Sequence, residues 1–325
     1  MGSSLIKKET RDLTYYGFKQ GKEDKKECGL KQYYNALMNS KVSEGKLNNI
    51  KQDFYQDPDM SYDIESEYYN DLTTFLNEQE SIHLNGNWIY NCNNEYPGGI
   101  DVIDKSTDKL LFKLRSDQFG FSVPVNGKNH PYGRYLVLSI EDGKKEEACK
   151  NIVNWINKTR TIGGSFLWPI RKCADGYFRT EYNQDRGGQV DPPKKSYYIQ
   201  DRVDLTLLEI KHCYDPNYEK KYSGDKLFRY YIDDEDYDEY ECSHMKQWLE
   251  HFGTFYNYVC FFKFSDFVNT KTLQIKNIIN NGYLEDVKRT PELTNNLSKE
   301  NWEEILKRVS SWTLNRSVEM VSSTS

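Results

Sequence analysis

The sequence predicts an α+β protein in which a mostly antiparallel sheet has helices packed against it and the C-terminal half is helical. Two observations lead to this prediction. Short runs of apolar and aromatic residues, separated by turn-forming residues, fill positions 88–140, as in a meander of short strands. Before and after this region, apolar residues recur three and four positions apart, which is typical of amphipathic helices.

Five runs in this region are expected to be strands, at 88–90, 100–103, 110–114, 119–125 and 135–140. Turn signals such as Pro97-Gly98-Gly99 and Asn126-Gly127-Lys128 separate them. Two further strands, at 162–168 and 177–182, are expected to join the same sheet, with helices on one side. The first contains Gly163-Gly164, where another backbone or a ligand could approach closely.

Helices are expected near 30–37, at 63–78, from about 143, at 201–214, once or twice between 243 and 267, and from about 299 to 315. Ser298 is the candidate N-cap of the last helix, Glu300 lies in its first turn, and the tail after Val318 is expected to fray. We therefore divide the chain into a polar N-terminal arm (1–28), an α+β core (29–215) and a helical C-terminal part packed on the core (216–325).

Composition limits the classes of function. The net charge of -6 and pI near 5.6 argue against a general DNA-binding surface, which normally carries an excess of basic residues. No apolar run is long enough to cross a membrane, and the charged N-terminus does not resemble a secretion signal. The seven cysteines are scattered without metal-type spacing. We therefore expect reduced thiols and a cytoplasmic protein.

Familiar catalytic motifs are absent from the sequence. It contains no P-loop, no G-x-S-x-G and no G-x-G-x-x-G, so an ATPase, an α/β-hydrolase and a dinucleotide enzyme have no positive support and the cofactor is unknown. His83 and His130 lie in loop-like surroundings, and His244 and His251 are too far apart to bind one metal ion, so a structural role is favoured for each. The acidic run 233–241 is best interpreted as a solvated loop.

The segment 159–215 combines arginines, carboxylates and glycines in otherwise apolar surroundings. One interpretation is a site for a phosphate-bearing ligand, because guanidinium groups suit phosphate and a Gly-Gly loop offers backbone N–H groups. Its ligand-binding residues would be Arg160, Asn183, Arg186, Gly187 and Arg202, and its catalytic residues Asp201, Asp204 and Glu209. The other interpretation is an internal ion-pair network that fixes the helix at 201–214 to the sheet. The sequence leaves both open.

The helix at 201–214 should be mostly buried, because it has two apolar faces. Val203, Leu207 and Ile210 lie on one side, and Leu205 and Leu208 lie nearly opposite. Arg202 and Glu209 fall between these faces. Since an unpaired charge inside a protein is costly, both side chains should bind other protein groups or an anion.

These residues also resemble a known group of proteins. The runs Arg160-Thr161-Ile162-Gly163-Gly164 and 199–209, with Asn183 and Arg186-Gly187 between them, are similar to a widespread family of uncharacterised bacterial proteins, known only as a domain of unknown function. The similarity extends more weakly to 30–41 and to 251–268. It implies a cytoplasmic protein and no particular reaction.

Two functions are therefore predicted as alternatives. The first is an enzyme, of the kind found in defence or toxin systems, that acts on nucleotide or nucleic-acid phosphate through the arginines and carboxylates of 159–215. The second is a non-catalytic adaptor that binds a protein partner through the exposed tyrosine pairs Tyr15-Tyr16, Tyr68-Tyr69 and Tyr230-Tyr231.

Overall fold

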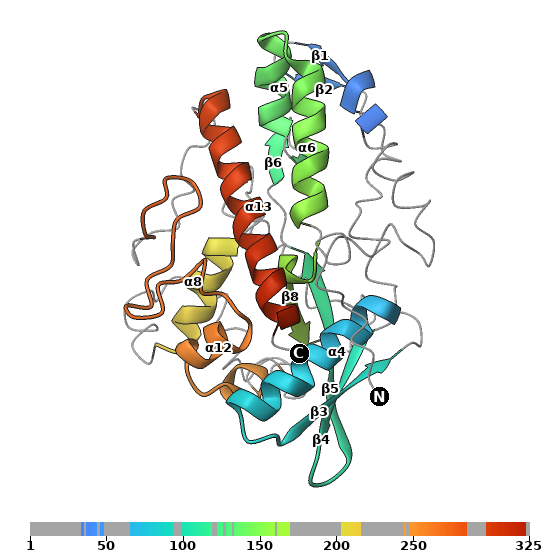
Figure 1. The fold of residues 1–325 in the computed structure, drawn as a ribbon, viewed down its shortest axis with the longest axis vertical. Coiled ribbons are helices and arrows are strands. Elements are labelled where there is room, and N and C mark those ends of the chain that lie inside the picture. The colour runs from blue at the N-terminus through green and yellow to red at the C-terminus, as the bar shows by residue number, and fades with distance from the viewer. Residues whose placement is uncertain are drawn as a thin grey trace, which may run out of the picture.

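A four-stranded antiparallel sheet lies at one end of the molecule, and helices cover it and extend away from it (Figure 1). The structure is a computed structural model. It describes residues 34–35, 37–43, 46–48, 66–93, 99–118, 122–125, 128–131, 133–159, 161–169, 203–215, 244, 247–284 and 297–322. Helices and an antiparallel sheet confirm the predicted α+β class.

The main sheet has the strand order β3-β4-β5-β8. Its strands are β3 (Trp88–Asn93), β4 (Gly99–Asp104), β5 (Lys109–Gln118) and β8 (Ser165–Pro169). Tyr90, Val102 and Phe112 are paired across three neighbouring strands and are all buried, so one face of the sheet is built into the core. This confirms the meander at 88–118 and the predicted strand at 162–168, whose first residues form instead the short 3-10 helix η3 (Ile162–Gly164).

Within the described residues, two short hairpins lie outside the main sheet. Strand β1 (Lys41–Ser43) pairs with β2 (Lys46–Asn48), and β6 (Ser122–Val125) pairs with β7 (Lys128–Pro131). The run at 119–125 was expected in the main sheet, and this part of the prediction is wrong because β6 pairs with the strand that directly follows it. The predicted turn residues Asn126 and Gly127 separate β6 from β7 in the chain.

The strand predicted at 135–140 is a helix, α5 (Gly133–Glu141). The run is apolar almost throughout, so its periodicity cannot distinguish a buried strand from a buried helix. Tertiary packing decides for the helix. The ring of Tyr135 meets that of Trp155 edge to face at 4.9 Å, and Asn151 donates a hydrogen bond to the Tyr135 hydroxyl. Both partners lie on the following helix, α6 (Lys145–Thr159).

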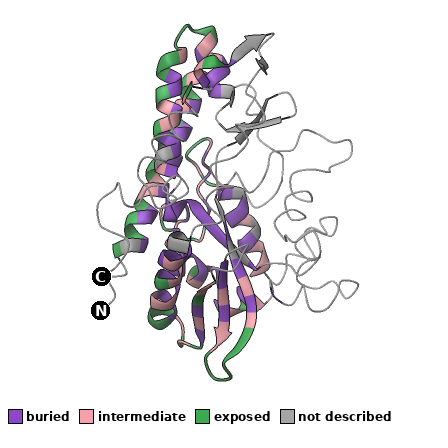
Figure 2. Ribbon diagram, turned by 90° about the vertical axis from the view of Figure 1, so that its right-hand side faces the viewer, coloured by how far each residue is buried: buried purple, intermediate pink, exposed green. Residues whose placement is uncertain are grey.

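The long terminal helix α13 (Lys299–Ser322) runs from the α5–α6 pair toward the main sheet (Figure 1). Figure 2 shows buried residues along its inner side and exposed residues at the tip of the α5–α6 hairpin. Ser298 accepts a hydrogen bond from the N–H of Asn301, which confirms the predicted N-cap. The helix continues beyond Val318, and Met320 is buried, so the expected fraying after Val318 is wrong.

Helix α4 (Ser66–His83) packs across the buried face of the sheet (Figure 1). Leu72, Phe75 and Leu76 are buried, as their spacing predicts. The side-chain amide of Asn77 donates to the carbonyl of Tyr90 at 2.7 Å and accepts from its N–H at 3.0 Å. Asn77 thereby satisfies backbone groups on the free side of the edge strand β3.

The remaining helices complete the core. Helix α8 (Val203–Cys213) buries Val203, Leu207 and Ile210, which confirms that the predicted helix at 201–214 is mostly buried. Residues 247–251 are helical, and α12 (Phe255–Phe261) follows, as predicted for 243–267. An irregular segment then leads to residue 284. Among the described helices, none is long and apolar enough to cross a membrane.

Candidate functional site

Asp204 is the one predicted catalytic residue whose side chain is described, and it holds a loop in place. Its carboxylate is fully buried and accepts a hydrogen bond from the N–H of Ile278 at 3.1 Å. Ile278 is also held through its carbonyl, to which Arg308 donates a hydrogen bond at 2.6 Å. The two side chains therefore fix this loop to α8 and α13. A catalytic role for Asp204 stays a prediction.

The other predicted site residues lie outside the described part of the chain. For Glu209 the structure gives the backbone, within α8, but not the side chain. The remaining residues, Asp201, Arg202, Arg160, Asn183, Arg186 and Gly187, are not described. How they are arranged around a ligand stays a prediction.

Gly163, three residues after Arg160, lies against the backbone of α13. A Cβ atom at Gly163 would lie 2.5 Å from the backbone nitrogen of Ser317, so only glycine fits here without a shift. The N–H of Gly163 donates to the Ser317 hydroxyl at 2.8 Å, and that hydroxyl also lies 2.6 Å from the hydroxyl of Thr161. The close approach predicted at Gly163-Gly164 is thus made by a helix of the same chain.

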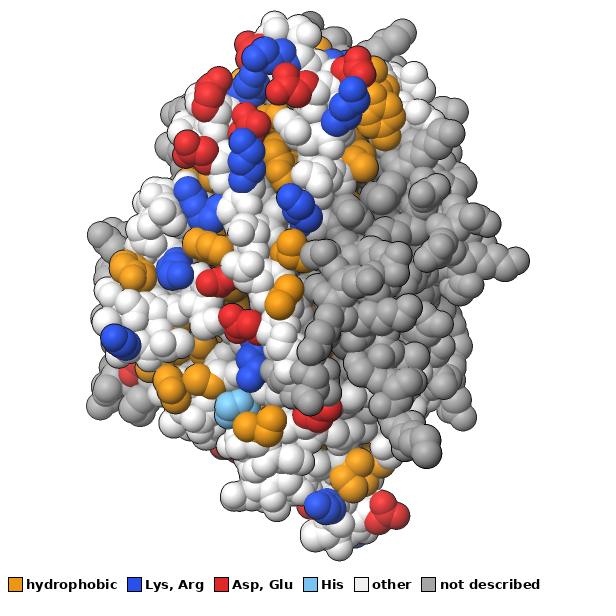
Figure 3. All heavy atoms as spheres, in the orientation of Figure 1, with side chains coloured by type: hydrophobic (Ala, Val, Ile, Leu, Met, Phe, Trp, Pro, Cys, Tyr) orange, Lys and Arg blue, Asp and Glu red, His pale blue; other side chains and the backbone are white. Residues whose placement is uncertain are grey.

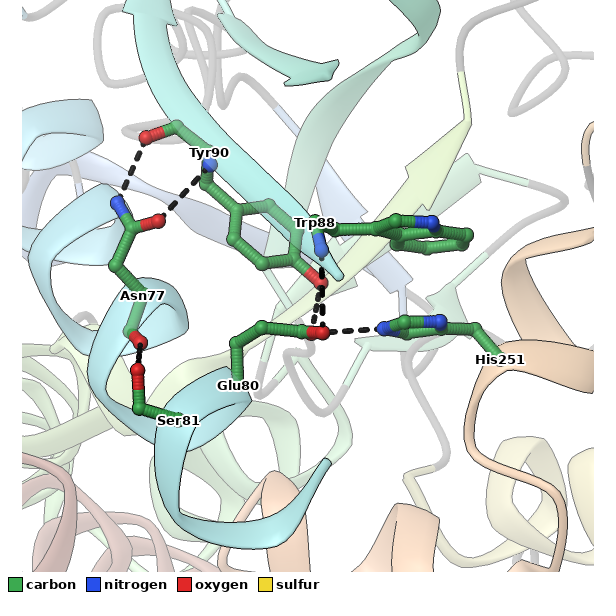
Figure 4. Close-up of polar contacts among 6 residues, drawn as sticks. All are labelled: Asn77, Glu80, Ser81, Trp88, Tyr90 and His251. Carbon is green, nitrogen blue, oxygen red and sulfur yellow. Dashed lines mark hydrogen bonds and ion pairs between the residues drawn. The ribbon is translucent and has the colours of Figure 1, made fainter. Parts of the chain in front are cut away.

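A buried carboxylate–imidazole pair is the arrangement among the described residues that most resembles catalytic machinery. Glu80 lies in the last turn of α4 and is 1% exposed, and Oε2 of its carboxylate lies 2.7 Å from Nε2 of His251 (Figure 4). The His251 side chain keeps 11% of its surface exposed. Its other ring nitrogen, Nδ1, makes no hydrogen bond to any described residue.

Strand β3 fixes the Glu80 carboxylate from a second direction. The Tyr90 hydroxyl donates to Oε2 at 3.1 Å, and the N–H of Trp88 approaches Oε1 at 3.4 Å (Figure 4). Burial, followed by the nearby charge of Glu80, raises the pKa of Tyr90 well above its ordinary value. Tyr90 therefore stays protonated and serves as a donor to Glu80.

Aromatic rings fix the orientation of the imidazole. The ring of Trp88 is parallel to that of His251, with centres 3.4 Å apart, and a nearly parallel Trp248 ring lies 6.2 Å from Trp88 (Figure 4 shows the first pair). Phe252 meets the His251 ring edge to face at 5.6 Å. Stacking and the bond to Glu80 together hold His251 in one orientation.

Such an arrangement can perform acid–base chemistry. If Nε2–H donates to Glu80, the tautomer is fixed and Nδ1 carries the lone pair that accepts a proton. The buried carboxylate would then stabilise the imidazolium that forms. Within the described residues, no group of three or more His, Cys, Asp or Glu side chains could hold a metal ion.

The sequence alone does not reveal this pair. Glu80 lies beyond the predicted end of its helix, and a structural role was favoured for His251. The available signal was the position of Glu80 four residues after Leu76, where a carboxylate continues the apolar stripe of α4. The loop-like surroundings expected for His83 and His130 are also wrong, because His83 ends α4 and His130 lies in β7.

Tyr69, one of the tyrosines expected to bind a partner, does not lie at the surface. Tyr69 is 1% exposed, and its hydroxyl lies 3.5 Å from that of Ser116 in the sheet. The pairs Tyr15-Tyr16 and Tyr230-Tyr231 are outside the described residues. The predicted adaptor surface therefore loses Tyr69.

Comparisons with known proteins agree with the predicted resemblance at the level of the family. No curated protein and no solved structure matches the chain. Residues 48–310, more than half of the chain, match the model of one protein family. The chain therefore belongs to DUF6994, a family of unknown function.

Proposed function

We propose that the protein is an enzyme that acts on a phosphate-bearing substrate, a nucleotide or a nucleic acid, with His251 as its general acid or base. The observation that supports acid–base chemistry is the 2.7 Å contact between His251 and the buried Glu80. The support for phosphate comes from the sequence. Arg160, Arg186 and Arg202 are guanidinium groups that suit phosphate oxygens.

In this proposal Nδ1 of His251 removes a proton from water or a substrate hydroxyl as its oxygen attacks phosphorus. A new P–O bond forms, the ester P–O bond breaks, and the departing oxygen receives the proton from the imidazolium. Glu80 keeps the tautomer and stabilises the imidazolium. Asn183 and the Gly187 loop would orient the phosphate beside the arginines.

Asp201, Asp204 and Glu209 are the competing acid–base candidates from the sequence. The bond from Ile278 to the Asp204 carboxylate favours a structural role for that residue. We therefore assign the proton transfer to His251 and keep Asp201 and Glu209 as further carboxylates of the segment that carries the arginines. We propose in addition that the protein is of bacterial origin. We also propose that the family is marked by the motif Asp201-Arg202-x-Asp204-Leu205-Thr206-Leu207.

The test is hydrolysis of a defined panel: bis(p-nitrophenyl) phosphate, nucleoside mono- and triphosphates, and a short single-stranded RNA. The variant His251→Gln should lower the rate at least about 100-fold, the lower range for loss of a general acid–base group. Glu80→Gln should also lower it, because the neutral amide no longer stabilises the imidazolium. Glu146→Gln, an exposed carboxylate on α6, is the matched control and should be unchanged.

Arg202→Ala tests the phosphate part separately. It should weaken phosphate binding, measured as the shift in melting temperature on adding nucleotide, in a protein that still folds. The proposal is wrong if folded wild-type protein neither binds nor cleaves any member of the panel, or if His251→Gln cleaves as fast as the wild type.

The alternative, a non-catalytic adaptor whose Arg/carboxylate cluster is structural, rests on the two tyrosine pairs that remain. Capture of a stable protein partner from the native cell by wild-type protein, together with inactivity on the whole panel, would favour it.

A further inference from the structure

Just after the C-cap of helix α12, a lysine lies at a position that glycine usually occupies. The N–H of Phe264 donates to the carbonyl of Val259 at 2.9 Å, and the N–H of Lys263 donates to that of Cys260 at 3.4 Å. This pair of bonds is the Schellman motif, whose penultimate residue is left-handed. Lys263 accordingly has a φ of 56°, a conformation that glycine adopts without steric cost and lysine does not.

A strained residue persists when its surroundings or its function require it, so the side chain of Lys263 needs an explanation. Its Nζ lies 3.5 Å from Nε2 of His83, the last residue of α4. Lys263 is half-buried, and His83 is exposed. His83 lies three residues after Glu80 on the same helix, so this second pair is next to the Glu80–His251 pair.

An acidic side chain lies beside Lys263, and a second one lies near the first. Glu319 on α13 interacts electrostatically with Lys263, and it also lies near Asp266 and accepts from the Ser265 hydroxyl at 3.4 Å. In Figure 3, a basic, an acidic and a histidine side chain form a row over the ends of α13 and α4. The row is open on the face that the figure shows.

The surroundings favour the uncharged forms of both bases. Burial lowers the pKa of the Lys263 amine, against the opposing influence of Glu319 and Cys260. Burial and the charge of Lys263 lower the pKa of His83. A neutral amine is a nucleophile, and a desolvated lysine beside another basic group is a recurring way to produce one.

We propose that Lys263 and His83 form a site for a carbonyl compound, in which the Lys263 amine condenses with an aldehyde or ketone to give an imine. His83 accepts a proton from the ammonium, and the freed Nζ lone pair attacks the carbonyl carbon. The resulting carbinolamine loses its oxygen as water, with a proton returned by His83. The balance is ammonium plus carbonyl to protonated imine plus water, with His83 restored, and it needs no oxidant or reductant.

The neighbouring charges favour a neutral electrophile over an anion. A phosphate or carboxylate at Nζ would meet the negative charge of Glu319. An aldehyde or ketone carries no net charge and avoids this repulsion. This inference does not depend on the proposed phosphate chemistry.

The experiment traps the imine in native full-length protein. The protein is treated at pH 7 with benzaldehyde and sodium cyanoborohydride, and the alkylated fraction of each lysine is followed by peptide mass spectrometry. Lys150 is the internal control, because it is exposed and its bond to Glu146 raises its pKa. Lys263 should be alkylated about tenfold faster than Lys150, because burial lowers the pKa of Lys263 while the bond to Glu146 raises that of Lys150.

Two variants complete the test. His83→Gln should slow alkylation of Lys263 several-fold and leave Lys150 unchanged. Lys263→Gly should remove the fast-labelled peptide while raising the melting temperature, since glycine suits the left-handed position. The inference is overturned if Lys263 in the folded wild type reacts no faster than Lys150, or if His83→Gln leaves its rate unchanged.

Discussion

The guanidinium of Arg316 lies over the ring of Phe264, with its carbon 3.8 Å from the ring centre. The same side chain is 2% exposed and donates to the carbonyls of Phe262, Gly163 and Ser165, at 2.7, 2.5 and 2.9 Å. One residue of α13 thereby joins the terminal helix to β8 and to the segment after α12. A lysine could not reach all three acceptors, because it lacks the planar fork of arginine.

Arg316→Leu should lower the free energy of unfolding by about 3 kcal/mol, because it leaves buried carbonyls without this donor and removes the stacking on Phe264. Arg316→Lys should cost less than Arg316→Leu. Urea unfolding followed by circular dichroism measures both. The control is Lys307→Ala on the exposed side of α13, which should change the free energy by less than about 1 kcal/mol. A loss no larger for Arg316→Leu than for this control would contradict the assigned role.

Gly163→Ala should destabilise the protein by about 1–3 kcal/mol through overpacking. The new Cβ would lie 2.5 Å from the Ser317 nitrogen and 2.6 Å from the Thr313 carbonyl oxygen, both in the backbone of α13. Gly282→Ala is the matched control, because its Cβ would meet only the flexible end of Asn280, at 3.1 Å. It should stay within about 0.5 kcal/mol of wild type. Equal effects at both glycines, in the same urea titration, would argue against close contact at Gly163.

How far the fold follows from the sequence depends on how local each signal is. Helix α6 and the N-cap of α13 at Ser298 were predictable, because their spacing and capping signals lie within one short segment. Helix α5 was not, because a run that is apolar at nearly every position fits a strand and a helix equally well. Its contact with Trp155 on α6, which decides the matter, is a tertiary one.

The candidate site depends even more than the fold on contacts between residues that are far apart in the sequence. Glu80 and His251 are 171 residues apart, and no local pattern connects them. The strain at Lys263 is also invisible in the sequence, where it is one of many lysines. The prediction that another backbone could lie close to Gly163 is confirmed, because a Gly-Gly pair in a strand indicates a local lack of space for a side chain. The pair does not indicate which element lies close to it.

Two neighbouring amides on α4 should respond in opposite directions to apolar replacement. Asn77→Leu should cost about 2 kcal/mol, because the N–H and carbonyl of Tyr90 would each lose a partner. Gln79→Met should instead stabilise by about 1 kcal/mol. The Gln79 side chain is fully buried, and neither amide atom has a hydrogen-bond partner among the described residues, so methionine removes an uncompensated cost.

The measurement for this pair is urea unfolding of both single variants beside wild type. A destabilising Gln79→Met would mean that its amide is satisfied by ordered water, and a neutral Asn77→Leu would mean that the edge of β3 does not depend on Asn77.

Lys263→Gly should raise the free energy of unfolding by about 1 kcal/mol, because a residue with a Cβ pays that much for the left-handed conformation. Lys263→Ala keeps the Cβ and is the matched comparison, since it also loses the contact with His83. Glycine should therefore be more stable than alanine at this position in a thermal melt. If alanine equals glycine, Lys263 is not left-handed in solution.

Cys149 should be the least reactive of the described thiols in the folded protein. It is fully buried in α6, and burial raises its pKa to about 11, with Lys145 lowering it and Glu146 raising it. At pH 8 only about one molecule in a thousand then carries the thiolate, the form that reacts with iodoacetamide. Cys260 is partly exposed and is the comparator. Mass spectrometry after brief native alkylation should find Cys260 modified well before Cys149.

In urea without reductant, all seven cysteines should react, and a count of five or fewer would show a disulfide that the sequence does not predict.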